Sequence, residues 1–278
     1  MMNNINFDRY QTIIIKVGSA LIAPDARACS AEYCLPIANF IKQCRNAGKD
    51  IILVSSGAVA AGFNQLGLTE HQLNLEQKQA LAAIGQSIVI RHWQRFFDQD
   101  VAQVLLTTDD INNPTRALNA KKTFAQLKRF GALPIVNEND TVVTEELKFG
   151  DNDMLAAQVA ILTDADLLII CSDVDGLYDD NPYLNPKAKL IEFIEPNDTR
   201  CQTYAHGSHN PRSMGGMLSK VQAALTANNN GINCIICNGK TEAYSQLWMN
   251  HNPGSWFLGK PQRQVSATPS DKASLSEA

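Results

Sequence analysis

The sequence predicts an α/β protein built on a mostly parallel sheet that helices cover on both faces. Short, continuously apolar segments alternate with amphipathic segments along most of the 278 residues. Strands of a parallel sheet are buried on both faces, so they read as apolar runs, and a helix commonly connects each strand to the next. A composition with 45% hydrophobic and 19% charged residues agrees with a sizeable core.

In the first half of the chain, apolar runs predict strands at residues 12–17, 51–54, 101–106 and 133–136. Helices fill the intervals. One begins at Ser30, a good N-cap residue, and runs to Arg45, and another begins at Gly57. The amphipathic pattern then predicts a long helix over 75–97, interrupted only at Gly85, and a helix over 115–129.

In the second half, the same reasoning predicts helices at 154–162 and 217–229 and strands at 166–171, 232–237 and 256–258. Two regions depart from this alternation. Residues 141–149 alternate weakly and predict a hairpin over the site, and residues 179–197 predict a loop with a short strand. We expect residues 1–260 to form the domain, and residues 261–278, rich in Ser, Ala, Pro and Lys, to form a disordered tail.

Charge and hydropathy narrow the functional classes. A net charge of -4 gives no general attraction to nucleic acid or to anionic membranes. No apolar run approaches the roughly 20 residues of a membrane span. The polar start of the chain, from Met1 to Tyr10, has no apolar stretch of a signal peptide, which predicts a cytoplasmic protein.

The cysteines and histidines predict no disulfide framework and no zinc site. Seven cysteines are an odd count with irregular spacing. Cys234 and Cys237 lie in an apolar run, and residues three apart on a strand point to opposite faces, so we interpret both as core residues. His206 and His209 have no matching ligands at zinc-site spacing and are interpreted as loop residues.

Glycine turns at predicted strand ends indicate a binding site for anions. Gly18 follows the first strand, Gly57 the second, and Gly215 and Gly216 precede the helix over 217–229. Ligands of parallel sheets bind beyond the carboxyl ends of the strands, where glycine lets backbone N–H groups approach a phosphate. Lys16 stands inside an apolar run, so it either reaches solvent at the strand end or faces a negative charge such as a phosphoryl group.

Two polar clusters and a turn accompany these glycines. Residues 137–140 (Asn-Glu-Asn-Asp) follow one strand, and residues 150–153 (Gly-Asp-Asn-Asp) open a helix, for which Asp151 is a plausible N-cap. Such groups suit an amino-acid ammonium, or they position lysines and Mg²⁺. The turn that begins at Ser172 and Asp173 is either a plain Asp-Gly turn or a nucleotide contact.

Familiar nucleotide motifs are absent from the sequence. Residues 254–260 fit the spacing of a Walker A loop, but Pro261 stands where a Mg²⁺-binding Ser or Thr belongs and the segment reads as a strand. The protein-kinase motifs H-R-D and D-F-G do not occur. No G-x-G-x-x-G follows the first strand, which argues against a dinucleotide-binding protein.

Taken together, the motifs resemble the amino-acid kinase family, and most closely its glutamate-phosphorylating members. The landmarks occur in the family's order over about residues 10 to 260; they are 14–19, 54–62, 78–86, 105–107, 134–140, 149–153, 173–178 and 215–220. The combination of Val-Ser-Ser-Gly-Ala-Val, Asn-Glu-Asn-Asp and Phe-Gly-Asp-Asn-Asp is the specific part of the resemblance.

The resemblance implies an α/β/α sandwich of the amino-acid kinase type that phosphorylates the side-chain carboxylate of L-glutamate with ATP and Mg²⁺, the first step of proline biosynthesis. Its N-terminal part would bind glutamate and its C-terminal part ATP. The implied catalytic residues are Lys16, Lys220 and Asp153, and the implied glutamate-binding residues are Ser56, Gly57, Asp140 and Asn152. The implied ATP-binding residues are Lys16, Ser172, Asp173, Met214, Gly215, Gly216, Met217, Leu218, Ser219 and Lys220, and no metal ligand is assigned.

The resemblance also implies a homo-oligomer, a dimer or tetramer, and proline as a feedback inhibitor. Three departures from the family pattern bear on these expectations. Ser213 and Met214 replace the usual Gly-Thr of the nucleotide loop, residues 110–116 are less acidic than usual, and we expect no C-terminal PUA domain.

Two alternatives stay open. A different acceptor is possible within the family: acetylglutamate, aspartate, carbamate, UMP or isopentenyl phosphate. Phosphate acceptors would call for more basic residues than the clusters at 137–140 and 151–153 contain. The second alternative is a nucleotide-binding protein without catalysis, which Met214 favours and the joint presence of Lys16, Asp153 and Lys220 opposes.

Overall fold

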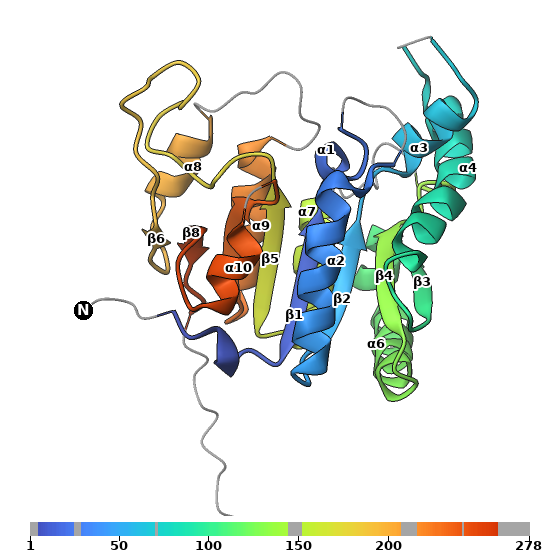
Figure 1. The fold of residues 1–278 in the computed structure, drawn as a ribbon, viewed down its shortest axis with the longest axis horizontal. Helices are drawn as coiled ribbons and strands as arrows, with labels where there is room; N and C mark the ends of the chain where they lie inside the picture. Colours follow the sequence, from blue (N-terminus) through green and yellow to red (C-terminus); the bar gives the residue numbers. More distant parts are fainter. Residues whose placement is uncertain are drawn as a thin grey trace, which may run out of the picture.

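A single sheet of eight strands forms the centre of the protein (Figure 1). The computed structural model describes residues 5–24, 29–69, 72–143, 152–206, 216–240 and 242–260. The strands lie in the order β3-β4-β2-β1-β5-β7-β8-β6, and all neighbours are parallel except β7 and β8. Their bounds are β1 (Thr12–Val17), β2 (Asp50–Ser55), β3 (Val101–Leu106), β4 (Leu133–Glu138), β5 (Leu167–Ser172), β6 (Phe193–Ile194), β7 (Asn233–Asn238) and β8 (Gly254–Phe257). The predicted, mostly parallel sheet is therefore confirmed.

Helices cover both faces of this sheet, as the sequence predicts. One core holds α2 (Ala31–Asn46), α4 (Leu75–Gln94) and α10 (Ala243–Trp248) against the sheet. The opposite core holds α6 (Pro114–Arg129), α7 (Asn152–Leu162), α8 (Arg200–His206) and α9 (Met217–Asn229). In Figure 1, α2 and α10 lie in front of the sheet and α7 and α9 behind it. The short elements η1 (Phe7–Arg9), α1 (Ser19–Ile22), α3 (Ala58–Gln65) and α5 (Thr108–Asn112) complete the described fold.

Alternation along the strands decides which side chains enter which core. In β1, Ile13 and Ile15 belong to the core that contains α2, whereas Ile14 belongs to the core that contains α7 and α9. Lys16 comes two residues after Ile14, so it points to the same face as Ile14. Cys234 and Cys237 divide between the two cores, which confirms that they are packing residues.

Several predicted boundaries need correction. β4 continues through Asn137 to Glu138, so the polar cluster begins inside the strand and not after it. The helices α5, α8 and α10 were not predicted from the sequence because each is at most seven residues long and shows little periodicity. His206, interpreted from the sequence as a loop residue, is the last residue of α8, and His209 lies outside the described residues. The short strand expected within 179–197 is confirmed as β6. Of the hairpin predicted at 141–149 only residues 141–143 are described, as a turn and its exit, and the tail at 261–278 lies outside the described residues.

The helix over 75–94 is not interrupted at Gly85, which corrects the prediction. A Cβ atom at Gly85 would lie 1.8 Å from the carbonyl oxygen of Ala58 in α3, and one at Gly62 would lie 2.0 Å from the carbonyl oxygen of Leu81 in α4. The two glycines therefore serve close packing of α3 on α4, and neither ends a helix. Two hydrogen bonds, from Trp93 to Ser55 and from Asn137 to Gln86, hold α4 beside the carboxyl ends of β2 and β4.

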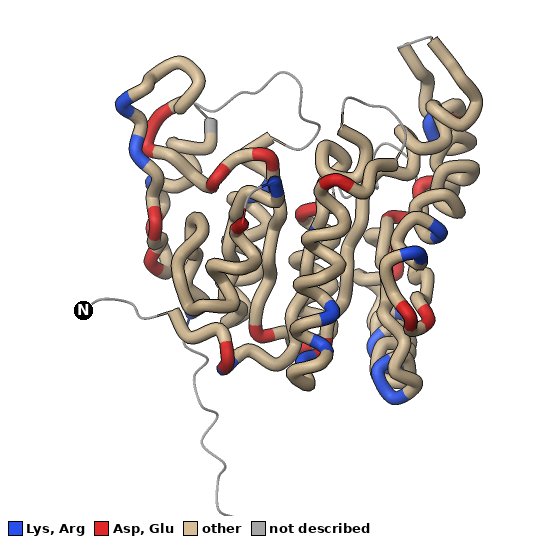
Figure 2. The backbone as a smooth tube through the Cα atoms, in the orientation of Figure 1, with Lys and Arg blue, Asp and Glu red and all other residues tan. Residues whose placement is uncertain are grey.

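The charged residues of both signs are spread over the molecule in Figure 2 and are not gathered in one stripe. Among the described residues, no helix combines the length and the apolar character that crossing a bilayer would require.

The α3–α4 contact gives a test of the packing. We expect Gly85→Ala to lower the free energy of unfolding by about 1–3 kcal/mol, because backbone atoms of α3 must move to admit the methyl group. Gly216→Ala is the matched control, since a Cβ there meets no atom within 4 Å; its effect should stay below about 1 kcal/mol. Urea denaturation of both variants measures the difference. Equal stabilities for Gly85→Ala and the unsubstituted protein would contradict the packing argument.

Candidate active site

The carboxyl ends of β1, β2, β4, β5 and β7 meet at one edge of the sheet, where three turns present glycine at the start of a helix. Gly18 is the N-cap of α1, Gly57 of α3 and Gly216 of α9, and none of these N-caps makes a side-chain capping bond. Gly57 has a φ of 99°, a backbone conformation that side chains rarely adopt. First-turn N–H groups without a side-chain cap favour an anionic ligand, as the sequence analysis expects.

A buried carboxylate with two lysines lies at this edge. Asp153, in the first turn of α7, is fully buried, with Lys16 Nζ 2.5 Å from its Oδ1 and Lys220 Nζ 3.0 Å from its Oδ2. Lys16 comes from β1 and Lys220 from α9, and their side chains are only 5% and 9% exposed. Ser219 also donates a hydrogen bond from Oγ to Asp153 Oδ2, at 3.1 Å. The structure thus brings together all three residues that the sequence analysis names as catalytic.

Electrostatics fixes the charge state of this cluster. Burial alone would raise the pKa of Asp153, but the positive charges of Lys16 and Lys220 outweigh it and hold that pKa at about 2. Asp153 is therefore an anion at neutral pH and cannot act as a proton donor there. Its chemical role is to keep two ammonium groups side by side despite their mutual repulsion. A pair of ammonium groups at the edge of a sheet can receive the oxygens of a transferring phosphoryl group.

The residue before Asp153 faces a different set of partners. Asn152 Nδ2 lies 3.2 Å from the carbonyl oxygen of Ser55, 3.0 Å from Ser56 Oγ and 2.7 Å from Asn137 Oδ1. Two of the expected glutamate-binding residues, Ser56 and Asn152, are therefore in direct contact. Gly57 follows Ser56 in the same turn, and Asp140 lies half-buried just beyond β4.

The expected ATP-binding residues lie at the carboxyl end of β5 and at the start of α9. Ser172 is buried at the last position of β5, and its hydroxyl donates to Asp173 Oδ1 at 3.3 Å. Gly216, Met217, Leu218 and Ser219 form the start of α9, which packs against α7. Met214 and Gly215 lie outside the described residues, as does Asp151 with its expected capping role.

Two further residues lie at this edge: Asn137, which the sequence indicated only as part of the cluster at 137–140, and Gln86, which it did not indicate as a site residue. Asn137 Nδ2 donates to Gln86 Oε1 at 2.8 Å, and both side chains are buried. Both stand inside landmarks of the family resemblance, so a signal existed. The contact between these two residues could not be predicted from their positions in the sequence, because helix α4 and strand β4 meet only in the folded protein.

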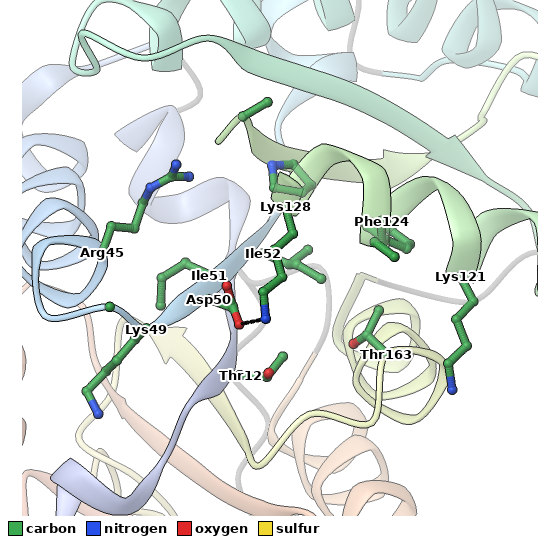
Figure 3. A pocket seen from close by; sticks show the side chains of 14 residues that line it. Thr12, Arg45, Lys49, Asp50, Ile51, Ile52, Lys121, Phe124, Lys128 and Thr163 are labelled. Carbon is green, nitrogen blue, oxygen red and sulfur yellow. Dashed lines mark hydrogen bonds and ion pairs between the residues drawn. The ribbon is translucent and has the colours of Figure 1, made fainter. Parts of the chain in front are cut away.

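A cavity of about 410 Å³ lies at the opposite edge of the sheet, where β1 and β2 begin (Figure 3). Its basic side chains already have protein partners. Lys128 pairs with Asp50, the amino group of Lys49 donates to three backbone carbonyls, and Arg45 donates to the carbonyl of Gly131 at 2.6 Å. Among the described residues no buried carboxylate joins two lysines there, so the carboxyl edge is the candidate active site.

No metal ligand set stands out in the part of the chain that the structure describes, where no group of three or more His, Cys, Asp and Glu side chains gathers. Asp153 is already paired with two lysines. A Mg²⁺ ion that enters with a nucleotide is held largely by phosphate oxygens, with one or two carboxylates from the protein.

The parallel sheet, the glycine turns at its carboxyl edge and the paired lysines define an α/β protein equipped for phosphoryl chemistry. A profile of the amino acid kinase family matches residues 11–238. The chain belongs to the amino acid kinase family.

Its sequence relatives include proteins named glutamate 5-kinase. The chain is 48% identical over 247 residues to the glutamate 5-kinase of Salinibacter ruber and 44% identical over 249 residues to that of Idiomarina loihiensis. These matches cover 88% and 89% of this chain but 66% and 67% of the relatives, so the chain spans about two thirds of their length. Among solved structures, carbamate kinase from Giardia lamblia bound to AMP-PNP has a TM-score of 0.63 at 16% identity, over 91% of this chain and 100% of that one. This likeness supports the fold.

The ion cluster gives a pH-dependent prediction. Replacing Asp153 by Asn leaves two lysines without their carboxylate, so we expect stability at pH 7 to fall by about 3–5 kcal/mol. The pKa of Asp153 is about 2 in the folded protein against an ordinary 3.8, so the unfolded chain takes up the proton first on acidification. The stabilisation is complete above about pH 5, falls as the pH passes through 3.8, and is mostly lost by pH 2.

The measurement is urea unfolding of the unsubstituted protein and Asp153→Asn between pH 7 and pH 2. The difference in unfolding free energy between them should shrink as the pH falls through this window. Asp164→Asn serves as control, because the side chain of Asp164 is 76% exposed and its pair with Lys121 lies on the surface. A difference that stays constant from pH 7 to pH 2 would contradict the assigned role of Asp153.

Proposed function

We propose that the chain is a glutamate 5-kinase domain, which transfers the γ-phosphoryl group of ATP to the side-chain carboxylate of L-glutamate. The observation that carries the proposal is the buried pairing of Lys16 and Lys220 through Asp153 at the carboxyl edge of the sheet. The sequence identity of 44–48% to two proteins named glutamate 5-kinase supports the choice of acceptor.

The cluster suits the chemistry of this transfer. A carboxylate oxygen of glutamate attacks the γ-phosphorus, the bond from that phosphorus to the bridging oxygen breaks, and ADP leaves with the electron pair. The carboxylate is already ionised at neutral pH, so the step needs no general base. Negative charge spreads over the phosphoryl oxygens in the transition state, and two fixed ammonium groups stabilise it. Lys16 and Lys220 are the proposed donors, and Asp153 positions them.

The acceptor is assigned to the side of β2 and β4. Ser56, Gly57 and Asn152 lie beside the lysines, and Asp140 lies beyond β4, one strand farther from β1. An elongated amino acid can extend from the lysines over β2 toward β4, with its ammonium group near Asp140. Amide and carboxylate groups of this kind fit an α-amino acid better than a phosphate-bearing acceptor.

The nucleotide is assigned to the side of β5 and α9. Ser172, Asp173 and residues 214–220 are the proposed contacts, with the phosphates directed to the N-terminus of α9. Mg²⁺ is expected to accompany ATP. The N-terminal part of the chain thus supplies the acceptor site and the C-terminal part most of the nucleotide site.

Oligomerisation, regulation and location remain predictions from the family resemblance. We expect a homo-oligomer, a dimer or tetramer, that acts in the cytoplasm and that proline inhibits. Sedimentation velocity and assays with added proline would measure the first two properties.

The deciding experiment is ATP turnover with Mg²⁺ and separate additions of L-glutamate, L-aspartate, N-acetyl-L-glutamate and UMP, with hydroxylamine to trap acyl phosphates. Glutamate-dependent ADP release with formation of γ-glutamyl hydroxamate is the expected outcome. Hydroxamate from another acid, or turnover with UMP, would keep the kinase and change the acceptor. ATP binding without turnover for every acceptor would favour a non-catalytic nucleotide-binding protein.

The role of Lys220 gives a further prediction. Lys220→Ala should lower kcat by several hundredfold or more, because it removes a donor that acts on the transition state. Lys121→Ala, at a 46% exposed side chain at the opposite edge of the sheet, is the control and should leave kcat within about twofold. Near-normal kcat in Lys220→Ala would remove this residue from the chemical step.

A further inference from the structure

A buried amide group at the candidate acceptor site lacks a hydrogen-bond partner. Gln86 of α4 is 8% exposed, and its Nε2 has no partner among the described residues. Leaving a buried donor unsatisfied costs roughly 1–3 kcal/mol, so such a group in a native fold calls for an explanation. The orphaned donor lies at the end of a chain of amide side chains that leads back to the phosphoryl site.

Two backbone groups fix the orientation of the three side-chain amides in this hydrogen-bonded series, those of Asn152, Asn137 and Gln86. The carbonyl oxygen of Ser55 can only accept, so the amide nitrogen of Asn152 faces it, at 3.2 Å. The backbone N–H of Glu138 can only donate, so it fixes Oδ1 of Asn137 as the acceptor, at 2.9 Å. The amide nitrogen of Asn137 must then donate to Gln86 Oε1, at 2.8 Å. Gln86 is consequently held with its NH₂ group at the free end, where it can only donate.

The surroundings of Gln86 select the chemistry of the missing partner. Gln86 lines a cavity of about 290 Å³ between α4 and the ends of β3 and β4, together with Glu138, Asn139 and Asp140. Two carboxylates disfavour an occupant that carries only negative charge. The site favours an occupant with two groups: a positive group that faces the carboxylates, and a carboxylate or carbonyl oxygen that accepts a hydrogen bond from the amide of Gln86. The zwitterionic head of an α-amino acid has both.

We propose that Gln86 donates a hydrogen bond from Nε2 to the α-carboxylate of the acceptor, while Asp140 receives its α-ammonium group. This inference rests on the proposed function and adds a residue that determines specificity. The amide chain from Asn152 through Asn137 to Gln86 then joins recognition of the amino-acid head to the turn that carries Ser56. Selection for a free α-carboxylate is the consequence.

The test compares L-glutamate with L-isoglutamine, in which a neutral amide replaces the α-carboxylate. Gln86→Glu keeps an oxygen for Asn137 but exchanges the donor for an acceptor. At pH 9, where we expect the introduced carboxyl to be ionised, the ratio of kcat/KM for glutamate to kcat/KM for isoglutamine should fall about 100-fold or more. Gln86→Met, which removes the donor without adding charge, should lower the ratio about 10-fold. Where turnover is too slow, dissociation constants for both compounds replace kcat/KM.

Gln126→Glu is the matched control, because it makes the same substitution at an exposed position of α6 and should leave the ratio unchanged. If Gln86 only supports packing, its substitution should lower kcat/KM for both substrates alike. A glutamate-to-isoglutamine ratio in the folded Gln86 variants that stays within about threefold of the ratio in the unsubstituted protein therefore overturns the inference. If Gln86→Glu does not fold, Gln86→Met decides. Absence of glutamate-dependent turnover in the unsubstituted protein would instead reject the proposed function, and this inference with it.

Discussion

The candidate site depends on one buried carboxylate. Asp153 holds Lys16 of β1 and Lys220 of α9, so it joins the central strand of the sheet to helices α7 and α9 behind it. A lysine in an apolar strand and another in a buried helix face would be costly without this counter-charge. The same arrangement that makes these lysines tolerable in the core leaves them beside the carboxyl edge of the sheet, where a phosphoryl group can approach.

The first turn of α7 organises both halves of the site because its consecutive residues face different partners. Asn152 bonds to the turn after β2 and to Asn137 of β4, whereas Asp153 bonds to the lysines. A movement of this turn would therefore shift the proposed acceptor groups and the proposed phosphoryl donors together. Transfer between two substrates requires this kind of joint positioning, since most of the catalysis lies in orientation and charge.

Packing of glycines supports the acceptor side. Gly62 and Gly85 let α3 and α4 approach until backbone atoms are in contact, and Gln86 follows Gly85 directly. A larger residue at either glycine would force α3 and α4 apart and so disturb the segment of α4 that carries Gln86. Helix packing is therefore linked to the proposed recognition of the substrate through one short segment of α4.

The sequence by itself determined the order of the strands and of the longer helices along the chain, because apolar runs and amphipathic periods are local patterns; the short helices α5, α8 and α10 escaped it. It also singled out Lys16, as a charge inside an apolar strand, and the glycine turns. The family resemblance grouped Lys16, Asp153 and Lys220, but only the tertiary structure gave the ion pairs themselves, since Lys220 is 67 residues from Asp153 along the chain and comes from another helix. The tertiary structure likewise decided the direction of the amide chain that ends at Gln86 and the continuity of α4 through Gly85. These depend on contacts between elements remote in sequence, and no local pattern encodes such contacts.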